Sequence, residues 1–212
     1  MDTHSLLAVS PIDGRYASKT EPLKSYFSEF ALIRYRIRVE IEYFIALCEI
    51  PLPKLADVDK SKYQAMRDIY LNLTPEQAME VKEIEKTTNH DVKAVEYFIK
   101  RHFHELGLDK WSEFVHFGLT SQDINNTSQP MMLKEAMENV YMPALKEVLD
   151  IISGMAEQWK DVPMLAKTHG QPASPTRLGK EFKVYQVRLE EQLRQFALLT
   201  YPAKFGGATG NM

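Results

Sequence analysis

An apolar repeat of three to four residues runs through most of this sequence and constrains its fold more than any other feature. The first clear case lies between about Pro22 and Cys48, where the repeat consists of Leu23, Tyr26, Phe27, Phe30, Ile33, Ile37, Ile41, Phe44 and Ile45. This spacing places the apolar side chains on one face of an α-helix, which we expect to pack against a core. The charged residues of the opposite face are interpreted as a solvated, mutually paired surface; they are Arg34, Arg36, Arg38, Glu40 and Glu42.

The same period predicts further helices, each bounded by capping or helix-breaking residues. A second helix covers about residues 60–72, and a third opens at Thr74 with the Thr-x-x-Gln pattern of a capping box and ends near Lys86. A fourth covers about residues 92–106 and is stopped by Gly107. The first half of the chain is therefore predicted to be helical.

Two longer helices are predicted in the second half. One runs from about residue 119 to Trp159, with a bend or local break expected near Pro130 and Pro143. The other covers about residues 178–196. No segment has the sustained alternation of a β-strand, so the predicted fold class is all-α.

Composition excludes several classes of protein. A formal net charge of -3 over 212 residues gives no general attraction to nucleic acid or to anionic membranes. No apolar run is long enough to span a bilayer, and the first residues lack the layout of a signal peptide, so we expect a cytoplasmic location. The single cysteine, Cys48, cannot form an internal disulfide and is interpreted as a core residue.

The stretch from Thr168 to Pro175 combines a histidine, a glycine, two prolines and polar side chains within eight residues. Gly170 and two prolines stiffen it, and His169 is expected to be held on that stiffened loop. Ser174 is interpreted as a helix N-cap with Pro175 in the first helical position, which would place a helix N-terminus, a favourable site for anions, beside the imidazole. The alternative is a rigid connector whose histidine only satisfies the backbone.

Three polar clusters lie where helices are predicted to begin: Thr88–Asp91, Thr120–Ser121 and Thr168–Gln171. If the fold gathers these ends, a multiply anionic ligand would be surrounded by N–H groups, hydroxyls and two imidazoles. The alternative for each cluster is plain helix capping. For the first cluster, that alternative assigns the cap to Thr88 or Asn89 and leaves His90 incidental.

Two further sets of residues have both a functional and a plain interpretation. Arg15 and Tyr16 end a turn-rich run and could grip a phosphate or carboxylate, or could form a solvated surface turn. A metal site built from His102, His104 and His116 carries little weight, because the first two point to different sides of a helix.

Four ordered motifs together resemble one enzyme family. They are Ser-Pro-Ile-Asp-Gly-Arg-Tyr at residues 10–16, Thr-Thr-Asn-His-Asp-Val-Lys-Ala-Val-Glu-Tyr at 87–97, Thr-Ser-Gln-Asp-Ile-Asn-Asn at 120–126 and Thr-His-Gly-Gln-Pro-Ala at 168–173. In order and separation they resemble the adenylosuccinate lyase family of the fumarase/aspartase superfamily, and its bacterial branch in particular. The resemblance covers essentially the whole chain.

The resemblance implies an architecture and an assembly. It implies a small N-terminal helical domain, residues 1–111, followed by the first long helices of a central bundle, residues 112–212. The family forms homotetramers whose active sites combine residues from three subunits. It needs no cofactor and no metal, and neither nucleic acid nor membrane is an expected partner.

The resemblance also implies a reaction: the elimination of fumarate from adenylosuccinate, giving AMP, and from the succinylated aminoimidazole carboxamide ribotide (SAICAR), giving AICAR. By motif match, His169 is the general acid and His90 assists it. The residues that bind the substrate are then Arg15 and Tyr16 at the phosphate, Thr120 and Ser121 at a succinyl carboxylate, Asn89 and Asp91 in the same stretch as His90, and Gln171 as a hydrogen-bonding partner.

One element of the family pattern is missing. The general base of the family is a serine in a Ser-Ser-x-Met-Pro-x-Lys loop, which lies downstream of the glycine-rich segment at 204–212. We therefore expect this chain to be an N-terminal fragment that is inactive alone, and its oligomeric state stays open. The rival interpretations are another lyase of the superfamily, such as argininosuccinate lyase, and a non-catalytic helical interaction module.

Overall fold

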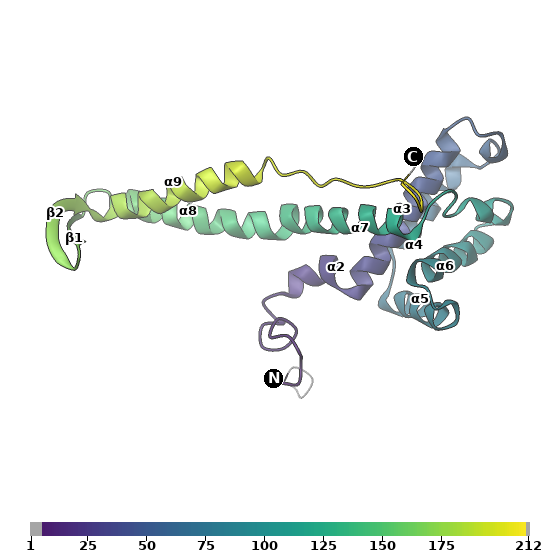
Figure 1. Ribbon diagram of the computed structural model, residues 1–212, viewed down its shortest axis with the longest axis horizontal. Coiled ribbons are helices and arrows are strands. Elements are labelled where there is room, and N and C mark those ends of the chain that lie inside the picture. The colour runs from purple at the N-terminus through teal and green to yellow at the C-terminus, as the bar shows by residue number, and fades with distance from the viewer. Residues whose placement is uncertain (1–5, 211–212) are drawn as a thin grey trace. The chain divides into compact units, whose positions relative to one another are not determined.

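The structure is a computed structural model and describes residues 6–210 (Figure 1). The chain divides into two compact units. The first takes the chain up to Ala136 together with the segment from Tyr201 onward, and the second is Met137–Thr200. The domain boundary expected between residues 111 and 112 stays a prediction.

The first unit is a cluster of helices around one long helix. Its elements are η1 (Glu21–Leu23), α2 (Lys24–Phe27), α3 (Glu29–Glu49), η2 (Pro53–Leu55), η3 (Lys60–Lys62), α4 (Tyr63–Leu71), α5 (Pro75–Thr88), α6 (Asp91–Glu105), η4 (Asp109–Phe114) and α7 (Ser121–Ala136). Helix α3 contacts α4, α5, α6 and α7, so it forms the centre of this unit (Figure 1).

The apolar face of α3 forms the core of the first unit, as the period predicted. Ile37, Ile41 and Phe44 are fully buried, and the ring of Phe44 meets that of Phe103 edge-on at 4.9 Å. Cys48 lies in the same core, which confirms its interpretation. Helical structure in this region begins at Glu21, near the expected start, but it is not one continuous helix. Ser28 adopts an extended conformation and caps α3 by accepting a hydrogen bond from the Ala31 amide at 3.1 Å.

The charged face of α3 departs from its prediction. Arg36 and Glu40 are only 5% and 0% exposed, so they are not part of a solvated surface. Both have polar partners on other helices and loops, which a helical repeat does not reveal. By contrast, the capping box at Thr74 is present as predicted, and the helix it opens continues to Thr88.

The second unit is a pair of helices joined by a β-hairpin. Its elements are η5, a π-helical turn (Met137–Tyr141), α8 (Met142–Gln158), β1 (Pro163–Thr168), β2 (Gln171–Arg177) and α9 (Leu178–Phe196). The π-helical turn just before Pro143 is the local break expected there, whereas Pro130 lies inside α7. Helices α8 and α9 pack together, with Trp159 and Phe182 in ring contact at 5.0 Å.

The hairpin corrects the prediction for Thr168–Pro175. Ser174 and Pro175 lie in β2, and α9 begins only at Leu178 with Arg177 as its N-cap. The strands are antiparallel, and a two-residue turn joins them. Prolines are tolerated because each strand of a two-stranded sheet is an edge strand. The all-α fold class is otherwise confirmed. None of the helices within residues 6–210 combines the length and apolarity needed to cross a membrane.

Candidate active site

The junction between α5 and α6 fixes the ring of His90. Asn89 ends α5 in the left-handed conformation, with φ of 49° and ψ of 34°, and the extended His90 is the N-cap of α6. The His90 Nδ1 atom accepts a hydrogen bond from the Lys93 amide at 3.1 Å. The alternative that assigned this cap to Thr88 or Asn89 is therefore wrong, because the imidazole itself serves as the cap.

The other ring nitrogen of His90 faces the start of α7. Its Nε2 atom lies 3.1 Å from the Ser121 hydroxyl oxygen. Because Nδ1 accepts the Lys93 amide, the proton of the neutral ring lies on Nε2, which then donates to Ser121. Two of the three predicted polar clusters thus meet at neighbouring helix N-termini, and the side chain of His90 remains 47% exposed there.

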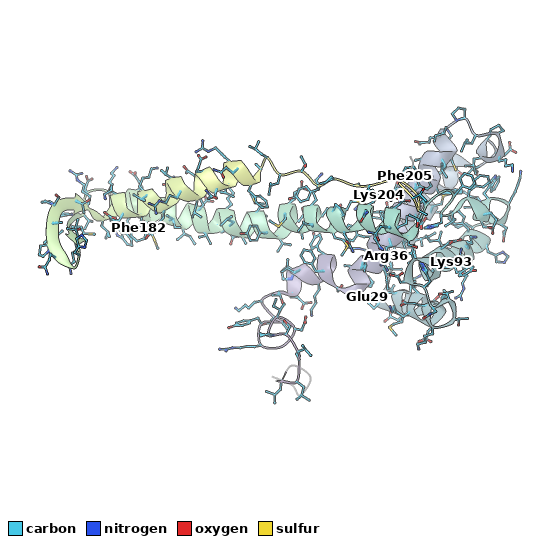
Figure 2. The ribbon with its side chains drawn as sticks, in the orientation of Figure 1. Glu29, Arg36, Lys93, Phe182, Lys204 and Phe205 are labelled. Carbon is cyan, nitrogen blue, oxygen red and sulfur yellow. The ribbon has the colours of Figure 1, made fainter. Side chains whose placement is uncertain are left out.

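A buried guanidinium lies behind this pair. Arg36, labelled in Figure 2, donates from Nη2 to the Asp91 carboxylate at 2.6 Å and from Nε to the Asn125 side-chain oxygen at 3.0 Å. Burial alone raises the pKa of Asp91, but the Val92 amide and the Arg36 guanidinium outweigh it and lower that pKa. The carboxylate of Asp91, predicted to be in the substrate-binding stretch, is thus engaged within the protein.

A second buried carboxylate ties the glycine-rich segment to α7. Asp123 is 2% exposed and accepts hydrogen bonds from the Thr120 amide at 3.0 Å, the Gly206 amide at 2.9 Å and the Lys204 ammonium at 3.0 Å. Burial raises the pKa of Asp123, and these donors reverse the effect and lower it. Asp123 therefore fixes the backbone at Thr120, next to Ser121.

The loop before Thr120 is held by a third buried group. The Glu40 carboxylate is hydrogen-bonded to Nδ1 of His116, a residue with φ of 62°. Burial raises the pKa of Glu40. Burial also acts to lower the pKa of His116, but the bond to Glu40 prevails and raises it. His116 therefore serves as a partner of Glu40, and no cluster of three metal-ligating side chains occurs within the described residues.

Two predicted residues lie at the start of the first unit. Arg15 and Tyr16 belong to the turns that precede η1 and are both exposed, with the guanidinium 5.4 Å from the centre of the Tyr16 ring. This cation–π contact orients the guanidinium on the surface. Their proposed grip on a phosphate stays a prediction.

His169 and Gln171 belong to the second unit, whereas His90 and Ser121 belong to the first. His169 and Gly170 form the turn of the hairpin, with φ of 49° and 75°. Both His169 and Gln171 are exposed. The helix N-terminus expected beside His169 is not there, because residues 171–177 form β2. The predicted stiff support is instead the hairpin turn itself.

Sequence reasoning missed the residues that support the candidate site. Arg36 and Glu40 look like surface charges in a helical repeat, and Asp123 stands in a motif without an assigned role. One signal was available for Asp123, since an acidic residue three positions after Thr120 can accept the amide of a helix N-terminus. No local signal pointed to Arg36, whose partners lie 55 and 89 residues away.

Comparison with known proteins connects this arrangement to a family. A protein-family model described as "Lyase" matches residues 14–212. The chain belongs to this lyase family. Among curated members of known name, the adenylosuccinate lyase of Dictyostelium discoideum is 52% identical over 215 residues, with 99% of this chain and 46% of that protein covered. The adenylosuccinate lyase of Escherichia coli (strain K12) is 42% identical over 213 residues, with 100% and 47% covered. The chain spans about half the length of these curated lyase relatives.

Solved structures support the same fold at lower identity. A fumarate lyase from Mesorhizobium sp. BNC1 is similar with a TM-score of 0.62 and 19% identity, over 90% of this chain and 43% of that one. A β-carboxy-cis,cis-muconate cycloisomerase from Acinetobacter calcoaceticus sp. ADP1 is similar with a TM-score of 0.66 and 17% identity, over 99% and 46%. At these identities the likeness extends to the lyase fold alone.

Proposed function

We propose that this chain supplies acid–base and substrate-binding residues of an adenylosuccinate lyase. The reaction is a β-elimination from adenylosuccinate to AMP and fumarate, and from SAICAR to AICAR and fumarate, in purine nucleotide biosynthesis. A base removes a proton from the carbon beside a carboxylate. The electrons of that C–H bond form the carbon–carbon double bond of fumarate as the C–N bond breaks. An acid protonates the departing nitrogen.

The observation that carries the proposal is the contact between His90 and Ser121 at two helix N-termini. Free N–H groups and a hydroxyl at such ends can bind a carboxylate of the substrate. An exposed imidazole beside them can exchange a proton with the bound substrate. In the proposal, Thr120 and Ser121 hold a carboxylate of the succinyl arm. His90 orients the substrate with the help of Asn89, and the substrate takes over the Ser121 hydroxyl from the imidazole.

The remaining roles rest on motif match. His169 is the proposed general acid, because an imidazole can hold a proton near neutral pH and still release it. Gln171 follows it across the hairpin turn and is a proposed hydrogen-bonding partner of the substrate. Arg15 and Tyr16 are the proposed phosphate ligands. The homotetrameric assembly and the cytoplasmic location belong to the same proposal.

The named relatives favour the purine substrate over the alternatives. The curated relatives described above are adenylosuccinate lyases, and the chain is similar to them along nearly its whole length. An argininosuccinate lyase is the second candidate within the superfamily. A non-catalytic module is disfavoured by an imidazole that meets a hydroxyl at an exposed position, since plain capping needs only the Lys93 amide.

The test uses a full-length enzyme that carries this sequence as its first 212 residues. Fumarate release is followed by absorbance with adenylosuccinate, SAICAR or argininosuccinate as substrate. We expect turnover of the first two, inhibition by AMP, and no turnover of the third. Turnover of argininosuccinate alone would replace the purine assignment, and no turnover of any of the three would favour the non-catalytic module.

A further inference from the structure

Arg36 on α3 donates side-chain hydrogen bonds to residues near the N-termini of both α6 and α7. Arg36 is 5% exposed, and an arginine is seldom buried to that extent unless its charge is paired. Its Nη2 atom donates to the Asp91 carboxylate, and its Nε atom donates to the Asn125 side-chain oxygen. The two acceptors come from different helices, so one planar group spans both.

The two acceptors of Arg36 lie close in sequence to the residues that meet in the candidate site. Asp91 follows His90 directly in the sequence. Asn125 lies four residues after Ser121 on α7 and hence on the same face of that helix. The guanidinium is thus bonded to the residue after His90 on α6 and to the residue one turn after Ser121 on α7.

Charge and exposure exclude a direct role for Arg36 in ligand binding. Its charge is compensated by Asp91 at 2.6 Å, and its side chain is 6% exposed. A substrate anion therefore finds neither free charge nor access at this guanidinium. The role left for Arg36 is to fix the positions of its two acceptors. Its two donors form a rigid fork for that purpose, which a lysine ammonium cannot reproduce.

We infer that Arg36 is a positioning residue that holds the N-termini of α6 and α7 in register, so that the His90 imidazole and the Ser121 hydroxyl face each other. This inference deepens the proposed function. The effect on turnover rests on that function, whereas the effect on the distance between His90 and Ser121 does not. A displacement of about 1 Å in a site of this kind can cost about 10²-fold in rate. The side chain therefore matters for activity without touching the substrate.

The first experiment reads the geometry directly in the 212-residue chain. Two quantities are measured for four proteins. They are the nuclear Overhauser effect between the His90 ring protons and the Ser121 Hβ protons, and the ¹⁵N chemical shifts that report the tautomer of the His90 ring. These are the unmodified chain, Arg36→Lys, Asn125→Ala and the control Arg34→Lys. Arg34 lies on the same helix but donates to the Ser25 carbonyl at 2.8 Å.

We expect the His90–Ser121 contact in the unmodified chain and in Arg34→Lys, and its loss in Arg36→Lys and Asn125→Ala. Asn125→Ala removes one hydrogen bond and leaves the ion pair with Asp91, so it decides the matter if Arg36→Lys does not fold. A contact that persists in every folded variant at position 36 or 125 overturns the inference, as does its absence from the unmodified chain.

The second experiment measures turnover in the full-length enzyme described above. Arg36→Lys is expected to lower kcat by about 10²-fold with a smaller change in KM, whereas Arg34→Lys changes either constant less than about twofold. Equal effects of the two substitutions would overturn the positioning role. If the unmodified enzyme has no activity, the proposed function is wrong. The magnetic-resonance experiment then still tests whether Arg36 positions His90 and Ser121.

Discussion

Lys204 and Asp123 lie 81 residues apart in the sequence, yet the ammonium nitrogen of one is 3.0 Å from a carboxylate oxygen of the other. Figure 2 labels Lys204 and its neighbour Phe205, whose ring lies 6.0 Å from that of Tyr43 on α3. The Gly206 amide adds a second bond to the same oxygen. The glycine-rich segment is thus fastened to the first turn of α7.

The first prediction concerns the stability of this attachment. Asp123→Ala removes the acceptor of the Thr120 and Gly206 amides and leaves the Lys204 ammonium with only the Gly207 carbonyl. We expect the free energy of unfolding to fall by about 2–4 kcal/mol. Asp57→Ala is the matched control. Its carboxylate is 78% exposed and 3.5 Å from Lys110, so we expect a loss below about 1 kcal/mol.

Urea unfolding followed by tryptophan fluorescence measures both substitutions. The chain has two tryptophans, so Trp159→Phe leaves Trp111 as the reporter of the first unit. Equal losses for Asp123→Ala and Asp57→Ala would show that the buried carboxylate contributes no more than a surface one.

The second prediction concerns pH. Since the pKa of His116 is raised in the folded chain, its contribution to stability is complete below about pH 6.5, the ordinary value for histidine. It is lost as pH rises through the raised value, because the folded state then keeps a proton that the unfolded state has released. The unfolding free energy of the first unit should therefore fall as pH rises above about 6.5.

Urea unfolding at a series of pH values checks this slope. His116→Gln removes the titrating group and Glu40→Gln removes its partner, so both are expected to flatten the curve in that window. A slope that survives in both variants must come from other groups.

The third prediction concerns the packing of α8 on α9. A Cβ atom added at Gly179 would lie 2.3 Å from the Ala156 carbonyl oxygen, so backbone must shift. We expect Gly179→Ala to destabilise the second unit by about 1–3 kcal/mol. Gly154→Ala on α8 meets nothing within 4 Å and should stabilise the helix by about 0.5–1 kcal/mol.

Fluorescence of Trp159 in a Trp111→Phe background reports the second unit in the same urea experiment. Opposite signs for the two alanine substitutions are the expected result. A neutral Gly179→Ala would mean that the two helices can separate there without cost.

The fourth prediction concerns His169. Asn is favoured before glycine in a two-residue hairpin turn with positive φ at both positions, so His169→Asn keeps the turn and removes only the imidazole. In the full-length enzyme we expect it to lower kcat by at least about 10²-fold, the usual contribution of a general acid. Circular dichroism and assembly state should remain unchanged, and near-normal turnover would remove His169 from the acid role.

The fifth prediction concerns the chain by itself. The Ser-Ser-x-Met-Pro-x-Lys pattern, which the family resemblance assigns to the general base, does not occur in these 212 residues. We therefore expect the isolated polypeptide to release no fumarate from adenylosuccinate. A rate comparable to that of a full-length lyase would show that another group serves as the base.

Periodicity predicted most of the helices, because burial of one face is a local property of the sequence. The capping box at Thr74 and the break before Pro143 were equally local. The β-hairpin was missed because its strands are short and rich in proline, and the Ser174-Pro175 pair imitates a helix start. The strand pairing, which runs from Pro163 with Arg177 to Thr168 with Gln171, distinguishes the hairpin from a helix start.

Part of the candidate site could be predicted, because some of its residues lie in local sequence motifs. His90 and Ser121 could be proposed from motifs at helix starts. The buried charges around that contact, Arg36, Glu40 and Asp123, each have at least one partner more than 50 residues away. A buried charge is recognised by its partner in space, and a single sequence does not give that partner.

Both nitrogens of the His90 ring are occupied, one by the Lys93 amide and the other by the Ser121 hydroxyl. With the proton on Nε2, the lone pair of the neutral ring is on Nδ1 and is used to cap α6. The ring therefore offers only an N–H toward Ser121, so it can donate a hydrogen bond at that position but cannot accept one there while the cap holds.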